Sequence, residues 1–157
     1  MDGEFALSES NAILQYAADL SGSDMHYPKD LKQRADINRC LLWEASTWFP
    51  SCYVYLVEYV VKPLINAEPD AAVIAKEAPN WHRLAGILDA RLATSKWLAG
   101  GNVTIADIAV AAPMHVHKWQ RLPLNDHPNL KRWVADVEQL PCWQKTQGAV
   151  ERALRLE

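Results

Sequence analysis

The chain has 157 residues, half of them hydrophobic and 22% charged, with a formal net charge of −3. This composition is that of an ordinary globular protein, long enough to form one domain with a sizeable core. The charge balance, without runs of Lys or Arg, argues against nucleic acid as a partner. No apolar run is long enough to span a membrane, and the first residues do not resemble a secretory signal.

The spacing of cysteines and histidines argues against disulfides and against a metal site. Cys40, Cys52 and Cys142 are odd in number and far apart, which is typical of a protein in the reducing cytoplasm. We expect Cys40 to be a buried thiol and Cys52 to be the more exposed of the two. His115 and His117 are two residues apart, so on a helix they point in different directions and do not chelate one metal ion.

The first residues predict a strand followed by a helix. Residues 4–7 alternate polar with apolar side chains, as a short strand does. Ser8 suits the N-cap of a helix that continues past Tyr16. A single strand has no partner for its backbone groups, so we expect this segment to be part of a fragment, to pair with another chain or to be disordered.

Helical spacing dominates the rest of the chain. After a linker over 20–29, we predict a helix over about 30–49 that Pro50 kinks or ends. The next run, 51–61, is rich in β-branched and aromatic residues, but its apolar side chains recur at i, i+3, i+4 and i+7, which favours another helix. Further helices are predicted over 71–95 with a bend at Pro79, from Pro128 and from Pro141.

We expect the fold to be organised around residues 97–112, WLAGGNVTIADIAVAA. A turn at Gly100 and Gly101 precedes Thr104, and Asp107 follows three residues later, which is the spacing of a capping box. The helix beyond is apolar or small nearly all the way round, so most of its sides should be buried. The sequence therefore predicts an all-α bundle around a central helix that Thr104 and Asp107 cap.

Four segments, in this order, resemble a glutathione S-transferase of the bacterial type: FALSESNAILQYAA, WEASTWFP, WLAGGNVTIADIAVA and HPNLKRWVADVEQLPCWQKT. The resemblance extends over the whole chain. It implies a C-terminal-domain-like helical bundle over 29–157. Over 1–24 it implies the last strand and third helix of a thioredoxin-like domain whose first part is missing.

The resemblance also implies a co-substrate and two groups of site residues. Glu9 and Ser10 would hold the γ-glutamyl end of glutathione, since a helix start offers free N–H groups to a carboxylate and Glu9 offers a negative charge to an ammonium group. Trp48 and Tyr53, on either side of the predicted kink, would line the pocket for an apolar electrophile. By spacing alone, Ser8, Glu9 and Ser10 are more typical of a capped helix start that needs no ligand, and the resemblance is what favours glutathione binding. The family's thiolate-stabilising residue has no counterpart here, so no catalytic residue is assigned.

Three functions therefore stay open. The first is a glutathione transferase that is inactive alone, because the thiolate-stabilising residue is missing. The second is a non-catalytic protein-interaction module, and the third is a protein that binds apolar ligands between its helices. We also expect association with a second copy or with another chain, because an unpaired strand and an uncovered helix face leave apolar surface exposed.

Overall fold

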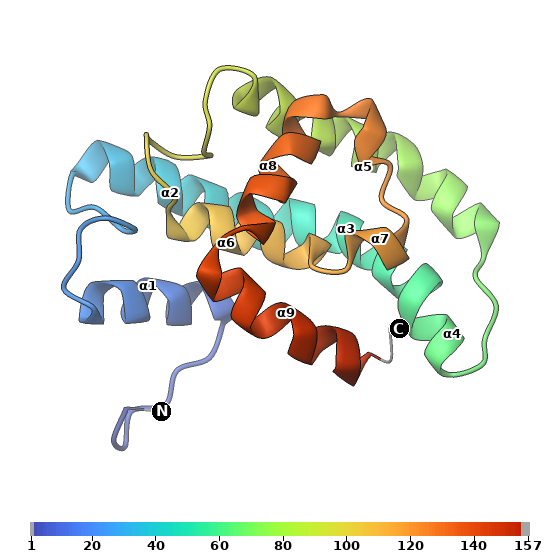
Figure 1. Cartoon of the computed structure of the whole chain (residues 1–157), viewed down its shortest axis with the longest axis horizontal. Coiled ribbons are helices and arrows are strands. Elements are labelled where there is room, and N and C mark those ends of the chain that lie inside the picture. The colour runs from blue at the N-terminus through green and yellow to red at the C-terminus, as the bar shows by residue number, and fades with distance from the viewer. Residues whose placement is uncertain (1, 155–157) are drawn as a thin grey trace.

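The computed structural model describes residues 2–154, and it is all-α, as the sequence predicts. The first half of the chain contains α1 (Ser10–Leu20), α2 (Leu31–Trp43), η1 (Glu44–Trp48), α3 (Phe49–Leu56), η2 (Val57–Val61) and α4 (Lys62–Leu64). The second half contains α5 (Ala71–Leu92), α6 (Ile105–Ala111), η3 (Ala112–Met114), α7 (His117–Gln120), η4 (Leu124–Asp126), α8 (Pro128–Glu138) and α9 (Pro141–Ala153). Figure 1 shows how these helices assemble into one bundle.

A single helical rod runs from Leu31 to Leu64, and two π-helical turns, η1 and η2, divide it. The helix predicted over 51–61 is confirmed, and of the two outcomes predicted at Pro50, a kink or an end, the end does not occur. Pro50 lies in the first turn of α3, directly after η1. A proline lacks an N–H and crowds the carbonyl four residues earlier, and the wider π turn accommodates it without ending the helix.

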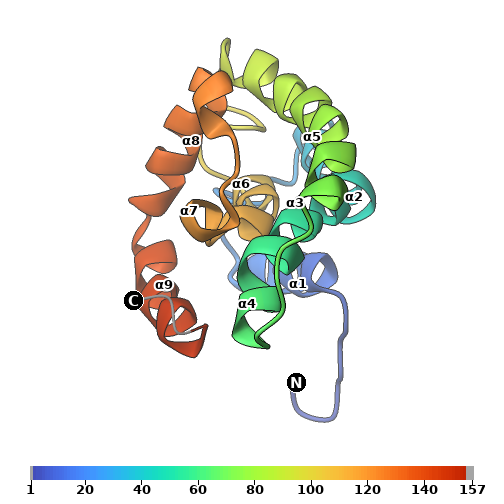
Figure 2. The ribbon, with the colours of Figure 1, turned by 90° about the vertical axis from the view of Figure 1, so that its right-hand side faces the viewer.

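The helix α6 lies at the centre of the bundle, as predicted. Figure 2 shows α6 and α7 between α8 and α9 on one side and α5, α2 and α3 on the other. Every residue of α6 is buried except Ile108. The indole rings of Trp48, Trp81 and Trp133 are fully buried around it, so large aromatic side chains from three different helices fill the core.

Asp107 holds the start of α6 together. One of its carboxylate oxygens accepts hydrogen bonds from the backbone N–H of Thr104 at 2.8 Å and from the Thr104 hydroxyl at 3.1 Å. The other accepts from the backbone N–H of Leu98 at 2.9 Å and from the Trp133 indole at 3.0 Å. The predicted capping box is present, and the same carboxylate also joins α6 to α8 and to the preceding loop.

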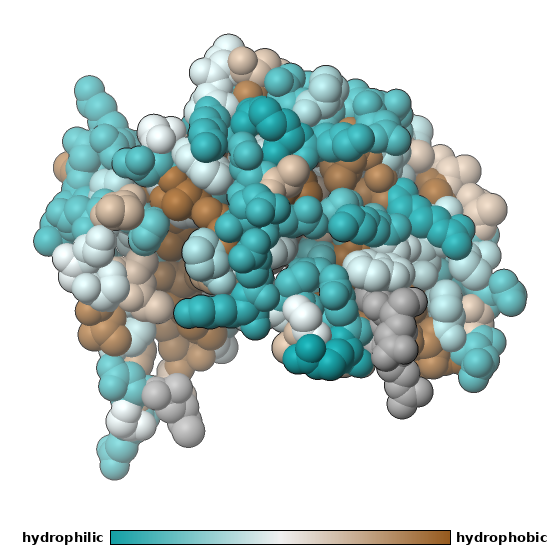
Figure 3. Space-filling model, viewed as in Figure 1, coloured by the Kyte–Doolittle hydropathy of each residue, from teal (hydrophilic) through white to brown (hydrophobic). Residues whose placement is uncertain are grey.

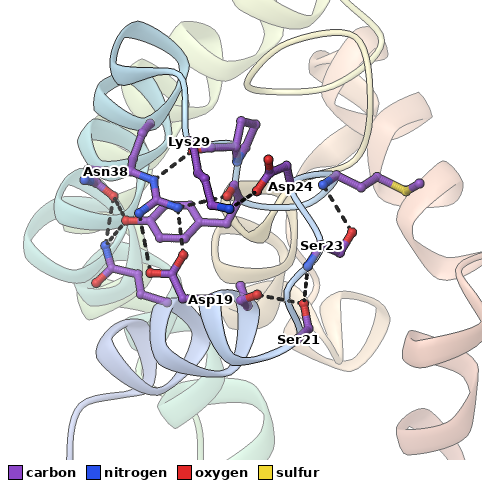
Figure 4. A network of polar contacts seen from close by, with 12 residues as sticks. Asp19, Ser21, Ser23, Asp24, Lys29 and Asn38 are labelled. Carbon is purple, nitrogen blue, oxygen red and sulfur yellow. Dashed lines mark hydrogen bonds and ion pairs between the residues drawn. The ribbon is translucent and has the colours of Figure 1, made fainter.

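A network of polar side chains fastens α1 and the linker after it to α2 (Figure 4). Gln15 on α1 donates to the Tyr27 hydroxyl and to Asn38 on α2. Arg34 on α2 donates to Asp19 at 2.7 Å and to the backbone carbonyls of Tyr27 and Pro28. These bonds set the orientation of α1, which has no buried residue of its own.

The strand predicted over 4–7 does not form. Asp2 and Phe5 instead exchange two backbone hydrogen bonds of 3.0 Å each in a tight turn, which makes an isolated bridge. Within residues 2–154 no second strand lies beside this segment. A strand without a partner has unsatisfied backbone groups, and this is why the segment forms a tight turn in place of the predicted strand.

The surface around α1 carries a group of exposed apolar side chains. Figure 3 shows apolar side chains gathered on this part of the molecule, and the large ones exposed there are Phe5, Leu7, Ile13, Tyr16 and Leu20.

Within residues 2–154, no helix has both the length and the apolar character that crossing a bilayer requires.

Candidate functional site

The start of α1 is an uncapped helix N-terminus. The N-cap is Glu9 and not Ser8, and the Glu9 side chain accepts no hydrogen bond from the first turn. Glu9 has a φ of 69°, a left-handed value that is costly for a residue other than glycine and that is concentrated at functional sites. Glu9 and Ser10 are both exposed, so the free N–H groups of the first turn are open to a ligand.

A groove of about 180 Å³ opens beside Ser10, between α1, the α2–α3 rod and α6. Apolar side chains make up most of its wall, and polar atoms come from a few residues only. Its lining residues are Ser10, Asn11, Leu14, Glu44, Phe49, Tyr53, Leu56, Ile108, Ala109, Ala112, Pro113 and His115. A small apolar pocket with few polar groups is the usual form of a small-molecule site.

The structure places the two predicted aromatic pocket residues in different surroundings. Tyr53 lines the groove and stacks on Phe49, with ring centroids 5.4 Å apart. Trp48 does not line it: its side chain is 0% exposed, and its indole donates to the carbonyl of Val110 at 3.0 Å. Because the helix continues through Pro50, Phe49 and Tyr53 share one face at i and i+4, and Phe49 stands where Trp48 was expected.

Glu44 is a groove residue that the sequence analysis missed. It is the first residue of η1 and is only 6% exposed. Its carboxylate accepts one hydrogen bond, from the Asn11 side chain at 2.9 Å. Burial raises the pKa of Glu44 above its ordinary value, and the bond from Asn11 opposes this rise. The sequence gives no sign that Glu44 is buried beside the groove, because its burial depends on how α1 packs on α2.

Ser10 and Asn11 also border a second cavity, of about 390 Å³, which lies between α1 and α2. Glu9 lines this second cavity, together with Gln15 of α1 and with Asn38, Leu41 and Leu42 of α2. The start of α1 therefore lies between two hollows, an apolar one toward α6 and a more polar one toward α2. A ligand at Glu9 and Ser10 would have access to both.

Among the described residues, no three His, Cys, Asp or Glu side chains are grouped so that they could hold a metal ion. Cys40 is buried as expected, but Cys52, expected to be more exposed, is 0% exposed, and burial raises the pKa of its thiol well above the ordinary value. His115 borders the groove, while His117 contacts Glu138 at 3.0 Å. His82 and His127 lie in contact with each other, with ring nitrogens 3.0 Å apart.

Together, these features define an all-α protein with an open helix start beside an apolar groove, an arrangement suited to an anionic ligand and an apolar one in adjoining positions. Over residues 53–141 the sequence matches the family described as glutathione S-transferase, C-terminal domain. The chain therefore belongs to the glutathione S-transferase family.

Individual members of the family are similar over most of the chain. Glutathione S-transferase F13 of Arabidopsis thaliana is 30% identical over 149 residues, which covers 92% of this chain and 68% of that protein. Glutathione S-transferase 3 of Zea mays is 30% identical over 160 residues, covering 96% of this chain and 69% of the relative. The solved structure of glutathione S-transferase III in apo form superposes with a TM-score of 0.83 at 29% identity, covering 95% of this chain and 70% of that one.

Proposed function

We propose that the chain binds glutathione at the start of α1 and an apolar electrophile in the groove between α1, α3 and α6. The observation that carries this proposal is the uncapped α1 N-terminus, where Ser10 borders that groove and Glu9 lines the adjoining second cavity. The membership of the family supports glutathione as the ligand. The chemistry of the two residues supports the orientation in which it binds.

The γ-glutamyl end of glutathione has a carboxylate and an ammonium group. The carboxylate is suited to the free N–H groups of the first turn of α1 and to the Ser10 hydroxyl, because the N-terminus of a helix carries a partial positive charge. The ammonium group is suited to the Glu9 carboxylate. The absence of a side-chain cap on α1 supports this assignment, because a cap would compete for the same N–H groups.

The apolar groove would take the second substrate. In conjugation, the glutathione sulfur forms a bond to an electrophilic carbon, the leaving group departs with its bonding electrons, and the thiol proton passes to solvent. The walls formed by Phe49, Tyr53 and Ile108 favour a flat apolar molecule. We assign no residue of this chain to stabilisation of the thiolate.

Calorimetric titration with glutathione tests the first half of the proposal. We expect binding to the wild-type chain and a loss of affinity of about tenfold or more in Ser10→Ala, with Ser8→Ala as the matched control, because Ser8 lies outside α1. Equal affinity in both variants, or no binding at all, would refute the site. Conjugation of 1-chloro-2,4-dinitrobenzene, followed by absorbance, tests whether the chain alone completes the reaction.

We also propose that the protein is cytoplasmic and associates through the apolar surface around α1. The exposed side chains of Ile13, Tyr16 and Leu20 support association, and the three free cysteines support a reducing compartment. Light scattering that finds only monomers at high concentration would refute the association.

The bacterial type and the division into 1–24 and 29–157 stay predictions; the two curated relatives named above come from plants.

A further inference from the structure

Glu44 gives the groove a negative charge that nothing within it balances. It is the only carboxylate among the described residues that line the groove, and no lysine or arginine lines it. The other titratable lining residues are Tyr53 and His115, and neither forms a hydrogen bond with Glu44. The groove therefore combines an apolar wall with one unpaired acidic group.

One oxygen of this carboxylate is available to a ligand. The Oε2 atom accepts the hydrogen bond from Asn11, whereas no residue in 2–154 donates a hydrogen bond to Oε1. The Oε1 atom is also not among the buried polar atoms that lack a partner, so it is in contact with solvent, and Glu44 is one of the residues that line the groove. A carboxylate has about four acceptor positions, and most of those of Glu44 are therefore unused.

The position of Glu44 follows from the π turn in which it lies. A π turn widens the helix and shifts the direction of the following side chains, and such turns are frequent at functional sites. Here the turn begins at Glu44 and is followed by Phe49 and Tyr53 on the groove wall. The acidic group and the aromatic rings thus come from adjacent parts of one rod, which holds their relative positions.

The energetics of a buried carboxylate favour a cationic partner. Burial removes water from the charged form, as the raised pKa of Glu44 indicates. A ligand ammonium group next to Oε1 would restore the lost electrostatic stabilisation in surroundings where charges interact more strongly than in water. An anionic ligand would instead meet repulsion with no positive side chain to relieve it.

We infer that the groove prefers flat apolar molecules that carry a protonated amine, and that Glu44 is the residue that determines this preference. The inference rests on the proposed function only in requiring that the groove takes an apolar molecule. It is independent of glutathione binding at Glu9 and Ser10.

Three probes with the same ring system test it by calorimetry at pH 7: 1-naphthylmethylamine, which is cationic; 1-naphthalenemethanol, which is neutral; and 1-naphthaleneacetate, which is anionic. For the wild-type chain we expect the amine to bind about tenfold or more tightly than the acetate, with the alcohol between them. Glu44→Gln keeps an acceptor for Asn11 and removes the charge, so it should abolish this difference while leaving the alcohol unchanged. Glu77→Gln is the matched control, because Glu77 is half-buried, accepts from Ser51 and Asn80, and lies outside the groove.

The outcomes separate the inference from the proposed function. If the alcohol binds but the wild-type chain does not discriminate between amine and acetate, the inference is refuted and the apolar groove stands. If the amine preference persists in Glu44→Gln, another residue determines it and the inference is equally refuted. If the alcohol does not bind to the wild-type chain, the groove is not a binding site, and both this inference and the electrophile half of the proposed function fail, while glutathione binding at Glu9 and Ser10 is judged by its own titration. If Glu44→Gln does not fold, the order of the three probe affinities in the wild-type chain still tests whether the groove prefers the amine.

Discussion

Replacing Asp107 with alanine should be among the most destabilising single changes in this protein. The carboxylate is 0% exposed and accepts four hydrogen bonds, from Leu98, from Trp133 and twice from Thr104. Alanine would leave three buried N–H groups without an acceptor, at a cost of about 1–3 kcal/mol each. Burial raises the pKa of Asp107, so removal of the desolvated charge offsets part of this loss.

The expected net loss in the free energy of unfolding is therefore about 3–5 kcal/mol. In a chain of this size this lowers Tm by about 10 °C or more. Asp107→Asn should cost less, about 1–3 kcal/mol, because its oxygen still accepts from Leu98 and Trp133 while its amide group faces the Thr104 N–H unfavourably.

Urea unfolding followed by circular dichroism measures both variants against Asp136→Ala. Asp136 is a partly exposed partner of Arg132 on α8, and its loss should change stability by about 0.5 kcal/mol or less. The reasoning would be refuted if Asp107→Ala were as stable as Asp136→Ala, since α6 would then not depend on its capping box.

Three further predictions follow from other parts of the structure. Glu9→Gly should raise Tm, because glycine relieves the left-handed backbone at this position by about 1 kcal/mol, and it should weaken glutathione binding; a lower Tm would show that the backbone is not strained. Asp89→Ala should cost about 1–2 kcal/mol in urea unfolding, because Asp89 accepts the N–H groups of Asn129 and Leu130 at the start of α8; an unchanged midpoint would exclude this capping role. Burial and the neighbouring His82 lower the pKa of His127 below 6.5, so stability should fall as the pH drops below 6.5 through the folded-state pKa; unfolding curves for His127→Gln should show a weaker fall over the same range, and an equal slope would contradict this.

The path of the α2–α4 rod illustrates what sequence periodicity misses. Apolar spacing indicates helix on both sides of Pro50, but the side chains that reach the groove depend on the π turns η1 and η2. Each π turn departs from the 3.6-residue period. For this reason Trp48, expected in the pocket, is in the core, while Phe49 and Glu44 line the groove.

The sequence by itself determined the features whose causes are local. The all-α class, the capped start of α6 at Thr104 and the beginning of α8 at Pro128 depend on residues within one or two turns of each other, and the structure confirms them. The tertiary structure alone decided which side chains meet across long separations. Asp89 caps a helix 40 residues away, Asn11 contacts Glu44, and residues 4–7 do not form a strand because no partner strand lies beside them within residues 2–154. These outcomes depend on how the helices pack against one another, and no local pattern in the sequence predicts that packing.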